Sequence, residues 1–134
     1  MGDIASSDAT ILLVDSDSAM RTSLRNVLQD ANYLVIAAGD LGEAIDRMTE
    51  IKPDLLVIRP YINSMPGAVA ADYLRGKQPG LPVLIVAGFM DDDQVDVRSA
   101  VHDFHTFPLP FRRAELLAKV RDVLTSARNR AARA

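Results

Sequence analysis

The segment Pro53-Asp54-Leu55-Leu56-Val57-Ile58-Arg59 predicts a buried β-strand that ends in a charged residue. Its run of aliphatic residues is typical of a parallel strand that is covered on both faces. Open α/β sheets place their reactive and binding groups just past the carboxyl ends of such strands. Arg59 is therefore a candidate site residue. A guanidinium stays cationic at physiological pH and is no nucleophile, so chemistry that needs an acid at this position is excluded.

Other apolar segments fit the same description, and a helical pattern follows each expected strand. The expected strands lie at residues 11–14, 33–37, 54–59, 81–86 and 106–108. The expected helices begin near residues 17, 40, 67, 91 and 111. Strands that alternate with helices predict βαβ units, which form a parallel sheet through right-handed crossovers. The expected fold is a single doubly wound α/β domain, with a five-stranded parallel sheet and helices on both faces.

Acidic residues at two helix starts are predicted to act as caps. Asp17 or Ser18 precedes the first apolar helical pattern, where a side-chain oxygen accepts a hydrogen bond from a free backbone N–H. Asp40 lies three residues before Glu43, which makes a variant of the capping box.

The length of 134 residues suits one compact domain. We expect a flexible N-terminus at residues 1–8, the folded domain at 9–127 and a basic tail at 128–134. The lack of cysteine excludes disulfides, thiolate metal ligands and cysteine nucleophiles. No apolar run approaches the ~18 residues of a membrane span, and the N-terminus lacks the pattern of a secretion signal. These features predict a cytoplasmic protein without a membrane segment.

The net charge of −3 is unevenly distributed along the chain. Residues 112–134 carry seven Lys and Arg against two acids, a net charge of +5, so the rest carries −8. The basic end is typical of a solvated last helix whose cations complement its dipole. It has no interleaved aromatic residues, which disfavours nucleic acid as the partner of this chain.

Several local motifs point to one family when they are read in order. The motifs are Leu12-Leu13-Val14-Asp15, Pro53-Asp54-Leu55-Leu56-Val57-Ile58, Met65-Pro66-Gly67, Leu81-Pro82-Val83-Leu84-Ile85-Val86 and Pro110-Phe111. Together with the last helical pattern at 114–120, they resemble the receiver domain of two-component response regulators over residues 9–127. The resemblance implies a flavodoxin-like (βα)5 fold and a role in phosphorelay signalling.

The resemblance also implies where a phosphorylation pocket would lie. In the family, two acids after the first strand hold Mg²⁺, and an aspartate that ends the third strand accepts the phosphoryl group. A Ser or Thr ends the fourth strand, and a Lys precedes Pro-Phe. The corresponding residues of this chain are Asp15, Ser16, Arg59, Ala87 and Leu109. Arg59 lies eight residues before Gly67, the family's usual interval, so the register needs no gap.

Further residues are expected to border this pocket. They are Asp17, Pro60, Gly88, Thr106 and Pro110. Pro60 has no backbone N–H to offer a phosphoryl group. Thr106 stands where the family has an aromatic residue that reports phosphorylation. The altered positions predict that no metal and no cofactor is bound.

We expect the Arg59 guanidinium to enter the space of the missing metal and to bond Asp15, with Asp17 as a second acceptor. A planar guanidinium suits a carboxylate, and its charge would replace that of Mg²⁺. The alternative is an arginine that extends into solvent over the loop.

The resulting functional hypothesis is a pseudo-receiver domain that is neither phosphorylated nor an enzyme. It would bind a kinase or an output protein through the fourth helix, the fifth strand and the last helix, and the resemblance also implies a homodimer as an alternative. Three rival hypotheses stay open: a still-functional phosphoacceptor, the N-terminal regulatory domain of a longer DNA-binding response regulator, and a flavodoxin-like ligand-binding domain. The partner and the pathway are not encoded in any motif.

Overall fold

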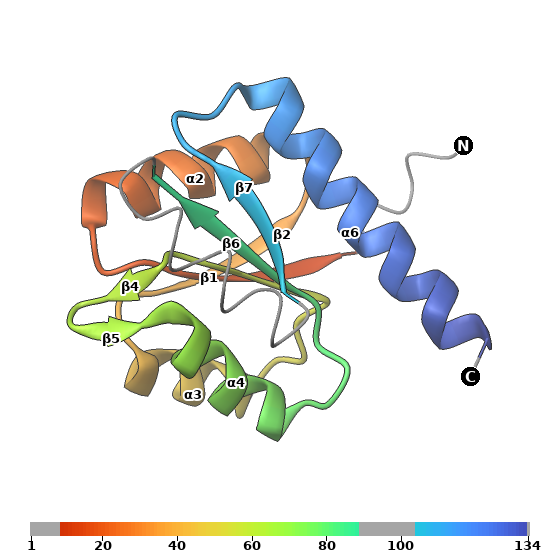
Figure 1. Cartoon of the computed structure of the whole chain (residues 1–134), viewed down its shortest axis with the longest axis horizontal. Coiled ribbons are helices and arrows are strands. Elements are labelled where there is room, and N and C mark those ends of the chain that lie inside the picture. The colour runs from red at the N-terminus through yellow and green to blue at the C-terminus, as the bar shows by residue number, and fades with distance from the viewer. Residues whose placement is uncertain (1–8, 89–103, 134) are drawn as a thin grey trace.

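The computed structural model describes residues 9–88 and 104–133, which form an α/β fold around a parallel sheet (Figure 1). Its strands are β1 (Thr10–Val14), β2 (Leu34–Ala38), β3 (Leu55–Ile58), β6 (Val83–Ala87) and β7 (His105–Pro108). They lie in the order β2-β1-β3-β6-β7, and each neighbouring pair is parallel. The predicted five-stranded parallel sheet is confirmed.

The described helices cover both faces of this sheet, as the predicted doubly wound arrangement requires. They are α2 (Ser18–Asp30), α3 (Leu41–Met48), α4 (Gly67–Lys77) and α6 (Arg113–Arg133). In Figure 1, α2 and α6 lie on one face, and α3 and α4 lie on the other. The helix predicted at residues 91–101 lies outside the described residues. Among the helices that are described, none combines the length and the apolar character needed to cross a bilayer.

Each face of the sheet has its own apolar core, because successive residues of a strand point to opposite faces. Leu12 and Leu56 belong to the core beneath α3 and α4, together with Leu74. Leu13 and Val57 belong to the core beneath α2 and α6. All five side chains are buried. The strands therefore read as continuous apolar runs, since neither face is exposed to water.

The predicted helix caps are present, and they fix where α2 and α3 begin. The Asp17 Oδ1 atom accepts hydrogen bonds from the N–H groups of Ala19 at 3.0 Å and Met20 at 3.3 Å, so Asp17 is the cap of α2. Asp40 Oδ1 accepts from the Glu43 N–H at 2.7 Å. Glu43 in turn accepts from the N–H of residue 39 at 2.6 Å, which completes the variant capping box.

Two features were not predicted. A short antiparallel hairpin, β4 (Tyr61–Ile62) and β5 (Met65–Pro66), connects β3 to α4. The last helix also continues to Arg133, so residues 128–133 are helical where a tail was expected. Val120 and Val123 are fully buried, whereas residues 125–132 are partly or fully exposed. The distal part of α6 thus extends beyond the apolar core.

The first residue of α4, Gly67, lies against the backbone that leaves β3. Its N–H donates a hydrogen bond to the Pro60 carbonyl at 2.6 Å. A Cβ atom on Gly67 would overlap the carbonyl oxygen of Arg59. Only glycine permits such an approach, so this contact explains the glycine at position 67.

Replacement of Gly67 by alanine is expected to lower the free energy of unfolding by about 3 kcal/mol, because the added methyl must displace backbone atoms. Gly76→Ala in the same helix is the matched control. Among the described residues, no atom outside the adjacent residues and the helix's own backbone lies within 4 Å of a Cβ at Gly76, so this change should stabilise the helix by roughly 0.5–1 kcal/mol. Urea unfolding followed by circular dichroism measures both values. Similar effects of the two substitutions would show that the contact at Gly67 is not tight.

Candidate functional site at the carboxyl ends of the strands

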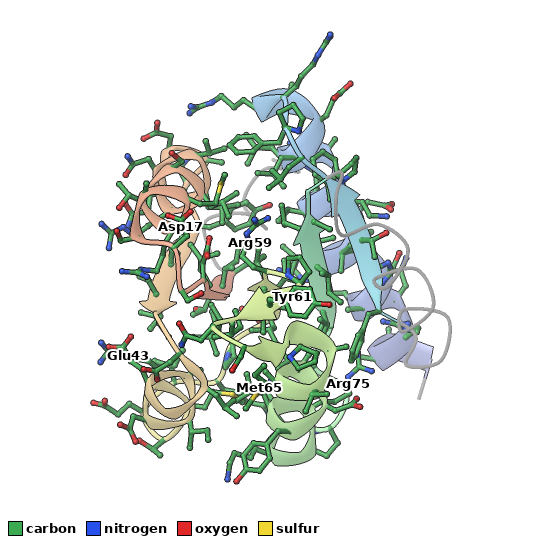
Figure 2. The ribbon with its side chains drawn as sticks, turned by 60° about the vertical axis from the view of Figure 1, so that its left-hand side comes forward. Asp17, Glu43, Arg59, Tyr61, Met65 and Arg75 are labelled. Atoms are coloured by element: carbon green, nitrogen blue, oxygen red, sulfur yellow. The ribbon has the colours of Figure 1, made fainter. Side chains whose placement is uncertain are left out.

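The parallel sheet brings the predicted pocket residues to one edge. Asp15 directly follows β1, Arg59 follows β3, Ala87 ends β6 and Leu109 follows β7. In Figure 2, Arg59 and Asp17 lie at this same end of the sheet, beside the start of α2. The edge is the place where open α/β sheets hold their sites.

Asp15 is the buried acid of this edge, with only 1% of its surface exposed. Its Oδ1 atom accepts a hydrogen bond from the Asp17 N–H at 2.9 Å. Its Oδ2 atom is buried and has no hydrogen-bond partner among the described residues. Burial raises the pKa of the Asp15 carboxyl above its ordinary value, and the bond from Asp17 and the charge of Arg59 oppose only part of this rise.

Arg59 lies beside Asp15, as the ion-pair hypothesis expected, but in a different geometry. Its Nε atom is 3.7 Å from Asp15 Oδ2, and 19% of its side chain is exposed. This separation is a charge contact rather than a hydrogen bond. The Nη1 atom instead donates to the backbone carbonyl of Val86 at 2.6 Å. The planar fork on the carboxylate is therefore not formed, and the side chain does not extend into solvent either.

The end of the β3–β6 ladder explains why the guanidinium turns to Val86. Leu56 N–H donates to the Pro82 carbonyl at 2.9 Å, and Ile58 pairs with Ile85 in the same register. Parallel pairing advances by two residues on each strand, so the nitrogen of residue 60 would be the next donor, to Val86. Pro60 has no N–H. The Arg59 side chain supplies the donor that the backbone lacks.

The other predicted residues have separate roles. The Ser16 hydroxyl accepts a hydrogen bond from the Asn63 N–H at 3.1 Å, which ties the loop after β1 to the β4–β5 hairpin. Asp17 caps α2. Leu109 is partly buried and packs against the core beneath α2 and α6. Its N–H donates to the Ala87 carbonyl at 2.7 Å, which extends the β6–β7 pairing.

The remaining bordering residues differ in burial and in their place along the strands and loops. Thr106 is paired with Ile85 in the middle of β7 and is partly exposed. Pro110 is exposed and follows a cis peptide bond. Pro60 is buried, and Gly88 is partly exposed just past β6.

Sequence reasoning missed Arg21, which also contacts the buried acid. Its Nη1 atom donates to the Asp15 carbonyl oxygen at 2.6 Å, and its charge is one of the influences that lower the pKa of Asp15. Arg21 lies one turn after the Asp17 cap, and its N–H bonds the Asp17 carbonyl. Its position near the start of α2, close to the acid that follows β1, is the sequence feature that could have identified Arg21 as a site residue.

The side chains at this edge do not form a suitable set of ligands for Mg²⁺. The ion requires an octahedral set of oxygen ligands, whereas here a guanidinium lies 3.7 Å from the buried carboxylate. The Ser16 hydroxyl is already directed to Asn63. Within residues 9–88 and 104–133, no group of three or more His, Cys, Asp and Glu side chains gathers to hold a metal.

Comparison with known proteins gives a family match over most of the chain. Residues 11–121 match the family described as "Response regulator receiver domain". Response regulator MprA of Mycobacterium tuberculosis is 37% identical over 117 residues, which are 85% of this chain and 50% of MprA. MprA of Mycobacterium leprae is 35% identical over the same length. The chain spans about half the length of these curated relatives.

Solved structures share the fold. NtrX of Brucella abortus has a TM-score of 0.86, with 19% identity over 92% of this chain and 28% of the NtrX chain. A CheY-like receiver domain protein from Methanospirillum hungatei has a TM-score of 0.82, with 22% identity over 91% of this chain and 98% of its own. The fold is thus that of CheY-like α/β domains.

The contact between Arg59 and Asp15 can be tested by stability measurements. We expect Arg59→Met to lower the free energy of unfolding at neutral pH by about 1–3 kcal/mol, because Asp15 stays buried without its nearby cation and the Val86 carbonyl loses a donor. The matched control is Arg47→Met, which removes the exposed pair with Glu43 at 3.6 Å. That change should cost less than about 0.5 kcal/mol. Equal losses in urea unfolding would contradict a structural role for Arg59.

A second measurement follows from the raised pKa of Asp15. Burial raises the pKa of the Asp15 carboxyl in the folded state. The protonated carboxyl therefore contributes to the free energy of unfolding, and this contribution is fully present below the ordinary carboxyl pKa. It is lost as the pH rises through the folded-state value. Asp15→Asn cannot ionise and escapes this loss. The stability of this variant relative to wild type should therefore increase between about pH 4 and pH 7, as measured by urea unfolding across that range. A constant or falling difference would refute the raised pKa.

Proposed function

We propose, from the premise that this chain belongs to the response regulator receiver domain family, that the domain signals by binding proteins and not by accepting a phosphoryl group. As a receiver domain of a two-component response regulator, it is a signalling module rather than a classical enzyme. The observation that carries the proposal is the position of Arg59, whose guanidinium lies between Asp15 and the Val86 carbonyl.

The chemistry of phosphoryl transfer argues against a functional acceptor at this edge. The reaction needs a nucleophile together with cations that neutralise the transferring oxygens. Arg59 supplies a cation where the family has the nucleophile. The Asp15 carboxylate is a poor substitute, because it is buried and one of its oxygens is bonded to the Asp17 N–H. An incoming phosphoryl donor would have to displace the guanidinium first.

The supporting groups of the family's pocket are also replaced. Ala87 has no hydroxyl to bond a phosphoryl oxygen, and it is buried at the end of β6. Leu109 packs its side chain into the core where the family has a lysine. Thr106 carries no aromatic ring to move between two positions. The family's coupling between phosphorylation and the surface of β7 needs a hydroxyl and an aromatic ring, and Ala87 and Thr106 supply neither.

The same contacts suggest a constant shape for the binding surface. Arg59 connects the carboxyl ends of three strands: its own β3, β1 through Asp15 and β6 through Val86. These links are part of the folded chain and need no phosphate. The family's usual output surface would then be presented permanently by β7 and the exposed side of α6. The helix that completes this surface in the family corresponds to residues 91–101, outside the described part.

Treatment with acetyl phosphate and Mg²⁺ tests the proposal. We expect the intact mass of the protein to stay unchanged, because no acid stands at the end of β3 to form an acyl phosphate. A gain of about 80 Da, the mass of one phosphoryl group, would overturn the proposal. A receiver domain with an aspartate at the acceptor position, treated in parallel, shows that the reagent is active.

The proposed binding of partner proteins without phosphorylation is tested by a separate measurement. The immobilised chain should capture the same partners from the source cell with and without acetyl phosphate. Capture that appears only under phosphorylating conditions would contradict a permanently presented surface.

A further inference from the structure

The edge where the strands begin, opposite Asp15 and Arg59, is bordered by a groove. One cavity of about 350 Å³ lies between residues 52–54, residues 78–82 and the distal part of α6. A second cavity of about 360 Å³ continues it toward the start of β7. Both are lined by Pro82, Ala127 and Ala131, so they are adjacent, and we call the two together the strand-start groove. In Figure 1, the distal half of α6 lies beside the loop that joins α4 to β6.

The charged residues that line the strand-start groove are mostly cations. They are Lys52, Arg75, Arg128 and Arg130, with Asp54 as the acid. Asp54 already accepts a hydrogen bond from the Thr10 N–H at 2.7 Å. The neighbouring cavity of about 430 Å³, between the ends of α3 and α4, shares Lys52 and adds Lys77 and Glu50. Among the described residues that line these three cavities, cations thus outnumber acids by five to two, although the whole chain is acidic.

Besides these charges, the groove contains small apolar residues, which we call its floor, and an arginine whose side chain is held in place. Pro82, Ala127 and Ala131 offer small apolar surfaces between the cations. Arg75 is held in place, because its Nε atom donates to the Leu81 carbonyl at 3.1 Å and its guanidinium lies 4.7 Å from the centre of the Phe104 ring. Of the groove's cations, Arg75 therefore needs little ordering when a partner binds.

We propose that the strand-start groove binds an acidic, partly apolar segment of a partner protein. Acidic side chains would pair with the cations of the rim, and aliphatic side chains between them would cover the floor. A nucleic acid fits less well, because His105 is the single aromatic ring among the described residues that line the groove, so successive bases would find no series of stacking partners. This inference goes beyond the proposed function and does not depend on Arg59, which lies at the other edge of the sheet.

The test uses a fluorescein-labelled peptide in which glutamate alternates with leucine, titrated with the full chain at low salt and followed by fluorescence anisotropy. We expect saturable binding that weakens as salt is added, since exposed charges are screened. The same peptide with glutamine in place of glutamate should bind much more weakly. Single-stranded DNA of equal charge serves as the competing class of ligand.

Charge-reversed variants locate the binding site. Arg130→Glu changes an exposed residue that lines the groove, and we expect affinity for the acidic peptide to fall about five- to tenfold. Arg121→Glu makes the same change in charge at an exposed residue of α6 that does not line the groove, and it should retain most of the affinity. Lys52→Glu tests the opposite rim.

Each outcome decides the inference. Loss of affinity in Arg130→Glu and Lys52→Glu, with retention in Arg121→Glu, supports it. No saturable binding by the wild type, equal losses in Arg130→Glu and Arg121→Glu, or tighter binding of the DNA with the same sensitivity to Arg130→Glu would overturn it. Because the salt dependence is measured on the wild type, the test stands even where a variant folds poorly.

Discussion

The guanidinium of Arg59 lies between two buried acceptors that the surrounding backbone leaves without donors. One is the Oδ2 atom of Asp15, 3.7 Å from Nε. The other is the carbonyl of Val86, bonded at 2.6 Å to Nη1. Leaving a charge or a carbonyl buried without a partner is costly. This one side chain therefore links the carboxyl ends of β1, β3 and β6, in addition to the backbone pairing of these strands.

Arg59 and Pro60 form a complementary pair of adjacent residues. The proline removes the backbone donor that would continue the β3–β6 pairing, and the arginine side chain replaces it. The end of β3 consequently carries a cation that contacts Asp15 and Val86. The opposite edge differs in kind, since its groove is open, its floor is apolar and its rim is positive.

Most of the fold could be predicted from local patterns. Continuous aliphatic runs marked the parallel strands, because these are buried on both faces. Asp17 and Asp40 marked the starts of two helices, because their carboxylates cap free N–H groups. The β4–β5 hairpin was missed because its strands have two residues each, too few for a periodic signal. The continuation of α6 was missed because its distal residues bury no apolar face, and apolar periodicity was the signal used.

At the site, the sequence predicted which residue types are present, but it did not predict which atoms they contact. The order of motifs was sufficient to place an arginine at the end of the third strand and Asp15 directly after the first. The choice of Val86 as the acceptor for Arg59 depends on pairing between residues 27 positions apart. The unpaired oxygen of Asp15 depends likewise on packing around β1. Such contacts arise only when distant segments are brought within hydrogen-bonding distance, because local patterns encode burial and periodicity but not the geometry between segments.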